Sequence, residues 1–190
     1  MNTPAHLIFG IAAFGKPDRP ATLWAATLGA LAPDLSLYLM GAVSLYLLRI
    51  PPNVVFGELY YSDAWQTVFA IDNSAILWGG LLAWALWRRH AVLTAFAGAG
   101  LLHIALDFPL HHDDGRAHFW PLTNWIFESP VSYWDARRHA GIVGPIEGAA
   151  SLILGLWAGW RIRHWGWRAA LAILLFLQLG ITSIWFRMLF

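Results

Sequence analysis

Six apolar stretches separated by polar connections constrain the fold of this chain more than any other feature. They cover residues 4–15, 21–48, 71–87, 91–110, 144–160 and 167–190. About 20 apolar helical residues cross a bilayer core about 30 Å thick, and several of the stretches approach or exceed that length. Lipid offers no hydrogen bonds to the backbone, so such segments must satisfy their own as helices. The sequence predicts an all-α, polytopic membrane helix bundle of about five to six hydrophobic helices, forming one domain over residues 1–190.

The composition excludes several classes of protein. Hydrophobic residues make up 58% of the chain and charged residues only 12%, against roughly 25% charged residues in soluble domains. Twelve basic and eleven acidic residues leave a net charge of +1, so no basic field is present to attract nucleic acid. The absence of cysteine excludes disulfides, thiolate metal sites and a cysteine nucleophile. A metal would have to be held by histidines and carboxylates.

The first two stretches depart from a simple span. Residues 4–15 are too few to cross a bilayer comfortably, so we expect a half-span or an interfacial helix there. The second stretch contains Pro33 and Asp34 near its middle. Proline lacks the backbone N–H that a helix needs, so a break or kink near Ala32 is predicted.

The polar connections divide between two faces. If all six stretches cross, residues 16–19, 88–90 and 161–168 share one face and carry seven of the twelve basic residues. The positive-inside rule makes that face cytoplasmic. Residues 49–70 and the long polar loop 111–143 then lie on the opposite face, and both read as connections rather than spans. We expect a multi-pass protein of the bacterial inner membrane with loop 111–143 in the periplasm.

The densest group of candidate ligands runs from His103 to His118. His103 and Asp107 are four residues apart, so on a helix both side chains leave the same face. An imidazole nitrogen and a carboxylate oxygen in this arrangement suit a divalent ion. Further candidate ligands follow closely, namely His111, His112, Asp113, Asp114 and His118.

Ionisable residues within apolar stretches are costly, and by default they indicate a functional site. His6, Asp34, His103 and Asp107 all have apolar surroundings. With alternating spans, the two histidines, Asp107 and Glu147 converge near one membrane face. Asp34 comes from the other side but lies about 20 Å into the bilayer, at 1.5 Å per residue. Asp72 and Asn73 are expected at the same level.

Each candidate also has a purely structural interpretation. The structural alternative for His103 and Asp107 is a buried hydrogen-bonded pair that ties helices together. Asp34 would cap a helix that begins at Leu35, and His6 would be an N-terminal turn residue. Asp113, Asp114 and Gly115 read first as a solvated turn. Arg116 and Glu147 would be a solvated loop residue and a first-turn acid, respectively.

Several of these motifs together resemble a known family. They are Pro4-Ala5-His6 before a small-residue helix, then Ala32-Pro33-Asp34, then His103-x-x-x-Asp107 followed by histidines and Phe119-Trp120-Pro121. In this order they resemble the bacterial predicted membrane-bound metal-dependent hydrolases, which are distantly similar in motif order to zinc-dependent phospholipase C. By this resemblance, which covers roughly residues 1–143, the metal ligands are His6, Asp34, His103 and Asp107, completed by one of His111, His112 and His118.

Two departures from the family pattern are visible. Members usually carry a Thr-His-Ser element before the third span, whereas this chain has Asp72-Asn73-Ser74. The His-x-x-x-Glu pair of the phospholipases is missing, because His139 and Glu147 are eight residues apart. We therefore do not expect a full three-zinc site.

The functional expectation is hydrolysis of an amphiphilic ester or phosphodiester at a membrane-embedded divalent ion, with zinc expected. Asp107 or Asp114 would accept a proton, and Arg116 would hold a substrate anion. Expected partners are the lipid bilayer and a lipid-like substrate, with a homo-oligomer left open. The alternative is a non-enzymatic polytopic membrane protein, such as a small transporter or a metal-binding or partner subunit.

Overall fold

The computed structural model describes the backbone of residues 1–189 and the side chains of residues 1–180. It is built from helices, and no β-strand occurs within the described backbone. The helices are α1 (Thr3–Phe14), α2 (Pro20–Ala42), α3 (Pro52–Val54), α4 (Asp63–Asp72), α5 (Ala75–Trp87), α6 (Ala91–Asp107), α7 (Ala140–Arg161) and α8 (Trp165–Leu189), with π-helical turns η1 (Val43–Leu47) and η2 (Val55–Leu59) and a 3₁₀ turn η3 (Ala136–Arg138). The predicted all-α fold is confirmed.

Three helical stretches among the described residues are long and apolar enough to cross a membrane. They are Pro20–Leu47, Asp63–Trp87 and Ala140–Arg161, of 28, 25 and 22 residues. Three further helices are apolar but shorter, namely Thr3–Phe14, Ala91–Asp107 and Trp165–Gly180. The predicted number of five to six hydrophobic helices is therefore only roughly confirmed.

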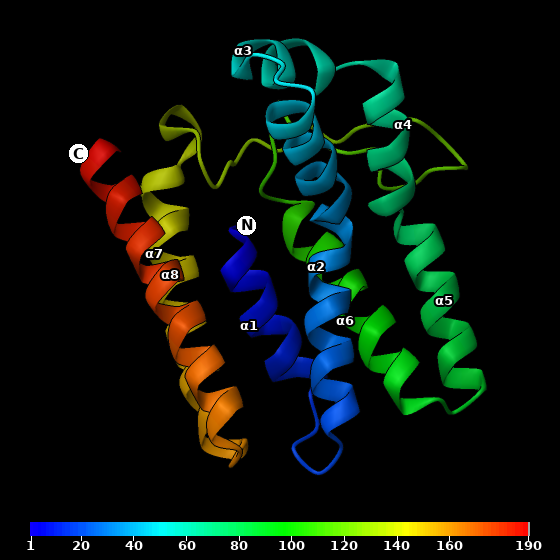
Figure 1. Ribbon diagram of the computed structural model, residues 1–190, viewed down its shortest axis with the longest axis vertical. Coiled ribbons are helices and arrows are strands. Elements are labelled where there is room, and N and C mark those ends of the chain that lie inside the picture. The colour runs from blue at the N-terminus through cyan, green and yellow to red at the C-terminus, as the bar shows by residue number, and fades with distance from the viewer. Residues whose placement is uncertain (190) are drawn as a thin grey trace.

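The connections separate between the two ends of the bundle as predicted. The turns that join α1 to α2, α5 to α6 and α7 to α8 lie together at the bottom of Figure 1. At the opposite end, α3, α4 and the long loop after α6 gather above the N-terminus (Figure 1). Exposed tryptophans, such as Trp87 and Trp160, lie at the basic end next to arginines, where an interfacial belt is expected. The membrane side of each end stays a prediction.

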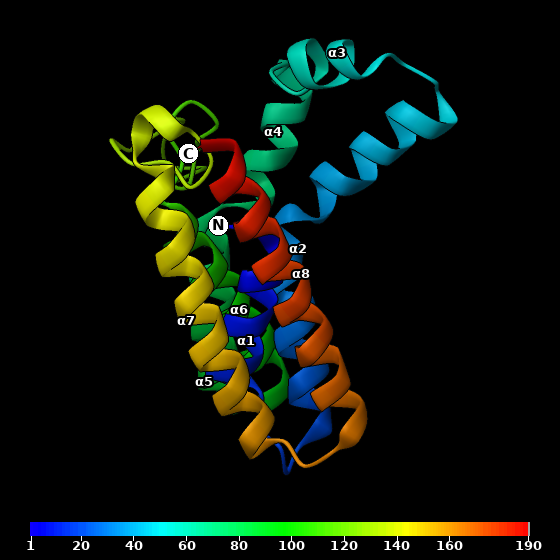
Figure 2. The same ribbon diagram turned by 90° about the vertical axis from the view of Figure 1, so that its left-hand side faces the viewer.

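The sequence predicts a break or a kink in α2 near Ala32, and the structure shows a bend without a break (Figure 2). The helix does not break near Ala32 but runs through Pro33 to Ala42, and Figure 2 shows that its axis changes direction along its length. Asp34 lies inside this helix, so its interpretation as the cap of a helix starting at Leu35 is wrong. The kink directs the upper half of α2 away from α7 and α8 (Figure 2).

The prediction that residues 49–70 are only a connection is wrong in its last part, because residues 63–70 begin the candidate span Asp63–Trp87. Residues 49–70 are also more ordered than a plain connection. They hold α3, η2 and most of α4. The Ser62 side chain accepts a hydrogen bond from the Trp65 N–H at the start of α4, a standard N-cap. The side chains of Trp65 and Phe69 form a buried apolar cluster with Val55. Local capping and this small apolar cluster explain these helices, which the composition of the segment did not lead us to expect.

Small side chains allow α1 and α6 to approach α2 closely. Ala26 and Ala30 of α2 pack against Ala95 and Ala99 of α6, the kind of contact that joins helices in membranes. Gly29 is the extreme case, because a Cβ there would lie 2.0 Å from the Phe96 carbonyl oxygen.

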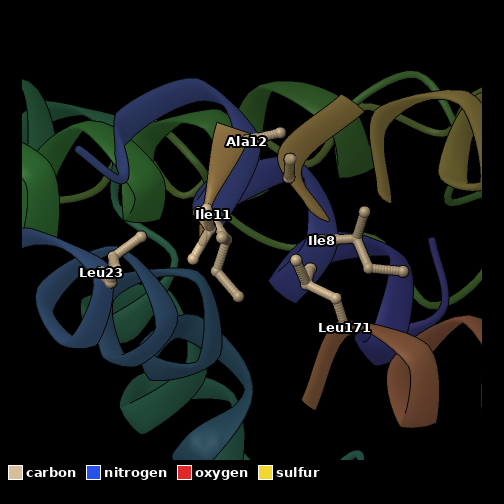
Figure 3. Close-up of a cluster of buried hydrophobic side chains, with 7 residues drawn as sticks. Ile8, Ile11, Ala12, Leu23 and Leu171 are labelled. Carbon is tan, nitrogen blue, oxygen red and sulfur yellow. The ribbon is translucent and has the colours of Figure 1, made fainter. Parts of the chain in front are cut away.

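The other side of α1 faces larger residues. Figure 3 shows Ile8, Ile11 and Ala12 of α1 among Leu23 of α2 and Leu171 of α8, and these residues form one buried cluster. Helix α1 is thus enclosed by α2, α6, α7 and α8. A short helix held on all sides can carry polar residues that a lipid-facing helix could not.

The close approach at Gly29 gives a matched test of the packing. We expect Gly29→Ala to lower the unfolding free energy by about 1–3 kcal/mol, because the methyl group meets backbone that cannot rotate away. Gly41→Ala in the same helix meets nothing within 4 Å and should be neutral or stabilising by about 0.5–1 kcal/mol. Thermal unfolding in detergent measures both, and equal effects would contradict the packing of α2 on α6.

Candidate metal centre

His103 and Asp107 lie at the C-terminal end of α6 on one face, as their spacing predicted. The Nδ1 atom of His103 lies 2.7 Å from the Ala30 carbonyl oxygen of α2. An N–H donated there leaves the lone pair of Nε2 free, the arrangement that orients many metal-binding histidines. Nε2 lies 3.1 Å from Asp107 Oδ2 and 3.7 Å from Asp34 Oδ1. It is buried and makes no well-oriented hydrogen bond.

His6 of α1 completes a buried group of three. Its ring stacks on that of His103, with centroids 3.6 Å apart and planes 12° apart. Its Nε2 lies 2.9 Å from Asp107 Oδ1. One ligand atom from each of His6, His103 and Asp107 lies within 4.8 Å of the others. Ligand atoms around a tetrahedral zinc ion are roughly 3.4 Å apart, so small side-chain shifts would close this group on an ion.

Asp107 is the centre of the cluster. Its Oδ1 contacts His6 and the amino group of Met1, and its Oδ2 faces His103 and, at 3.4 Å, His111 Nε2. A buried carboxylate is costly unless paired. Here polar groups from α1, α6 and the loop after α6 surround it, so the predicted convergence of distant residues occurs.

Residues of the long loop extend the cluster on one side. His111 Nδ1 lies 2.9 Å from Asp114 Oδ2, and the indole N–H of Trp134 donates to the same oxygen at 3.1 Å. Asp114 Oδ1 is buried without a hydrogen-bond partner. Burial opposes the charged form of His111, but the carboxylates of Asp107 and Asp114 outweigh it and raise the pKa of His111 to about 9. A cation bound there would have to displace that proton.

His118 differs from His111 in its charge. Burial lowers the pKa of His118 to about 4, so its ring is neutral near pH 7. Its Nδ1 lies 2.9 Å from the Arg116 carbonyl oxygen, and its Nε2 is buried with no hydrogen-bond partner. A neutral imidazole with one nitrogen anchored and the other unpartnered has the form of a metal ligand or a proton acceptor.

A cavity of about 350 Å³ opens beside the cluster. Asp34, Asp107, His111, Asp114, Arg116 and His118 line it, together with Tyr38, Tyr60 and Tyr133. Burial and the nearby carboxylates raise the pKa of Tyr133, so its hydroxyl stays protonated and able to donate. His6 and His103 are buried behind Asp107 rather than on the cavity wall.

Not every predicted ligand lines this cavity. His112 is the exception among the predicted histidines: its Nδ1 lies 2.7 Å from the Ser129 carbonyl oxygen, and it does not line the cavity. A bond from His112 to the same ion is therefore not supported. Asp113 is exposed, as its interpretation as a turn residue predicted. Asn73 lines the cavity, whereas the neighbouring Asp72 does not.

Glu147 has a role that the sequence did not indicate. Helix α7 begins at Ala140, so Glu147 is not a first-turn acid, and that interpretation is wrong. Its Oε1 accepts hydrogen bonds from the Asn2 backbone N–H, the Asn2 amide and the Gln178 amide, each at 2.9 Å. It anchors the residues before α1 and does not line the cavity. The one available signal was an acid within an apolar stretch.

The residues present fit a divalent ion. Two buried imidazoles and a carboxylate converge, their remaining nitrogens lack partners, and Asp34 and His111 are near enough to add a ligand. The tyrosines of the cavity wall were not predicted, because nothing in their local sequence distinguishes them from interfacial aromatics.

Comparison with known proteins identifies no relative: no family model, curated protein or solved structure matches the chain.

The anchor at Glu147 is testable separately from any metal. We expect Glu147→Ala to lower the unfolding free energy by about 2–3 kcal/mol, because the half-buried Asn2 and the buried Gln178 lose this acceptor. Glu128→Ala, at an exposed position of the long loop, is the matched control and should change stability by less than about 0.5 kcal/mol. Thermal unfolding in detergent measures the difference, and equal stabilities would contradict the anchoring role.

Proposed function

We propose that this protein is a membrane-embedded, metal-dependent hydrolase that acts on an amphiphilic ester or phosphodiester. The observation that carries the proposal is the buried group His6, His103 and Asp107, whose ligand atoms lie within 4.8 Å of one another beside a cavity. Buried charges and unpartnered imidazoles lower the stability of the fold, so a cluster of them indicates a functional site. The motif resemblance described above favours the same function.

His6, His103 and Asp107 would hold the ion, with Asp34 or His111 as an additional ligand. A bound divalent ion, for which zinc is the expected identity, would polarise a substrate oxygen and make water more acidic. Asp107 already contacts an ammonium group and three imidazoles. Asp114 keeps one unpartnered oxygen, so Asp114 is the better placed of the two carboxylates to accept a proton.

The position of the cavity favours a substrate that comes from the lipid. Helix α1 has twelve residues and α6 seventeen, so they rise about 18 and 25 Å from the end with the short turns. If the short turns lie at one surface of a hydrocarbon core about 30 Å thick, the cluster would lie between the middle of that core and its opposite surface. Leu37 and Tyr38 of α2 line the cavity, and Leu35, Tyr38 and Leu39 are exposed on that candidate span. An amphiphile would reach the cavity along this side of α2.

The same proposal places the protein in a bacterial inner membrane. Seven of twelve basic residues belong to the three connections at one end, which favours that end as cytoplasmic and the 111–143 loop as periplasmic. The cavity would then face the periplasmic leaflet. Apart from lipid and substrate, a second copy of the chain is the remaining partner to consider.

One observation favours the alternative of a non-enzymatic membrane protein. The Met1 amino group and the imidazoles around Asp107 already provide this carboxylate with partners. A polar cluster of this kind can fix helix positions without binding an ion. The two functions differ in whether the cluster binds metal and whether Asp114 matters for any reaction.

Metal content is the first test. We expect one or more equivalents of a divalent metal, zinc first, to remain with the protein purified in detergent. The changes His103→Ala and Asp107→Asn should each reduce it at least about 10-fold, since each removes a ligand. His112→Ala is the matched control and should retain the wild-type content, because His112 lies outside the cavity. Elemental analysis measures the metal content of all four proteins. An equal, negligible metal content in all of them would contradict the metal proposal.

Activity is the second test, measured on bis(p-nitrophenyl) phosphate and on a p-nitrophenyl acyl ester in mixed micelles. Asp114→Asn should lower kcat by about 10²–10⁴-fold, the usual effect of losing a general base, while metal content stays near that of the wild type. Asp113→Asn, at the exposed neighbouring position, should retain activity. Metal-dependent hydrolysis that is the same in both variants would assign the proton transfer elsewhere; hydrolysis of neither probe by the metal-loaded protein would favour the non-enzymatic alternative.

A further inference from the structure

We propose that Arg116 forms an anion subsite that binds the phosphate group of the substrate, which makes the substrate a phosphate ester of an amphiphile rather than a neutral carboxylic ester. This inference rests on the proposed function for the reaction that follows binding. The subsite itself rests on three independent features: the fixed position of the guanidinium, its unpartnered nitrogen and its place on the cavity wall.

Two aromatic rings hold the guanidinium of Arg116. Its central carbon lies 4.2 Å from the centre of the Phe69 ring and 4.9 Å from that of the Tyr60 ring. Phe69 is 1% exposed and belongs to the cluster of Trp65 and Val55, so one of these rings is firmly anchored. Cation–π contacts use the flat faces of the guanidinium and leave the N–H groups at its edge free for an anion.

One of those nitrogens lacks a partner. The Nη1 atom of Arg116 is buried and has no hydrogen-bond partner. A charged donor buried without an acceptor costs more than an ordinary lost hydrogen bond. An arginine serving only as a surface charge would direct this atom to water, so the alternative interpretation of Arg116 as a solvated loop residue is not favoured.

The subsite adjoins the candidate metal centre. Arg116 lines the same cavity as Asp107, Asp114 and His118, and its carbonyl oxygen anchors the His118 ring at 2.9 Å. A phosphate group bound to Arg116 would therefore place its ester bond in the same cavity as Asp114, the proposed proton acceptor.

The charge of the substrate decides between the two ester classes. A carboxylic ester is neutral before reaction, so a fixed guanidinium would gain little by binding it. A phosphate ester carries its negative charge from the start, and its oxygens match the paired donors of arginine. Three carboxylates, from Asp34, Asp107 and Asp114, line the cavity, so an anion would enter only where fixed positive charge offsets them. Arg116 supplies such a charge in addition to the Met1 amino group and the protonated His111, and it is the only guanidinium among the residues that line the cavity.

Phosphate binding tests the subsite without relying on catalysis. Titration of the detergent-purified, metal-free protein with inorganic phosphate by isothermal calorimetry should detect binding. Arg116→Gln should weaken it by roughly 10- to 100-fold, the range expected for a charge-assisted pair. The phosphate affinity of Arg116→Lys should lie between those of the wild type and Arg116→Gln. Lysine keeps the charge but lacks the paired N–H donors of the guanidinium. Arg137→Gln in the same loop is the matched control, since Arg137 pairs with Asp135 and does not line the cavity.

Steady-state kinetics then distinguish a free phosphate site from a substrate site. For a lipid phosphate in mixed micelles, Arg116→Gln should raise KM by roughly 10-fold or more, and inorganic phosphate should inhibit the wild type competitively. For the p-nitrophenyl acyl ester, the same change should lower kcat/KM by a smaller factor than for the lipid phosphate, because the ester is neutral before reaction. Phosphate binding without any effect on the lipid phosphate would show a site for free phosphate and overturn the substrate assignment.

Other outcomes separate this inference from the proposed function. Phosphate binding that is absent, or equal in wild type and Arg116→Gln with both variants folded by circular dichroism, overturns the subsite even where metal-dependent hydrolysis of the acyl ester persists. Conversely, phosphate binding through Arg116 by a protein that binds no metal would support the subsite and contradict the proposed hydrolase function.

Discussion

A single buried carboxylate organises the polar interior of this protein. Asp107 contacts the Met1 amino group, His6, His103 and His111 through its two oxygens. A charge in that position is unfavourable unless partners neutralise it and satisfy its oxygens. Its partners come from the start of the chain, from its own helix and from the loop that follows. The requirement to pair one acid therefore ties together segments that are about a hundred residues apart.

The small residues of α2 and α6 make this arrangement possible. Where Gly29 faces the Phe96 carbonyl oxygen, the two backbones come closer than any side chain would permit. That approach brings the Ala30 carbonyl oxygen within 2.7 Å of His103 Nδ1, which fixes the orientation of the ring. Helix packing and site geometry are thus the same feature, since the alanine and glycine contact that joins the helices also orients a candidate ligand.

The proposed hydrolase and its anion subsite use different parts of the structure. The candidate ligands belong to α1 and α6 inside the bundle, whereas Arg116 depends on aromatic rings of η2 and α4 at its upper end. The cavity lies where these two parts meet. Helix α4, which the composition of residues 49–70 did not reveal, contributes to the proposed subsite because it supplies Phe69, the ring that Arg116 contacts.

The sequence by itself determined the class of fold, the division of the connections between two ends and the acids and histidines worth attention, because hydropathy and the high cost of charge in an apolar segment act locally. It also placed His103 and Asp107 on one helix face, since the spacing of four residues is a local property. The tertiary structure alone decided that His111 and His118 line the cavity while His112 does not, that Glu147 anchors Asn2, and that tyrosines and Arg116 form part of the cavity wall. Those outcomes depend on the path of the loop and on how distant helices approach, and no local pattern encodes either.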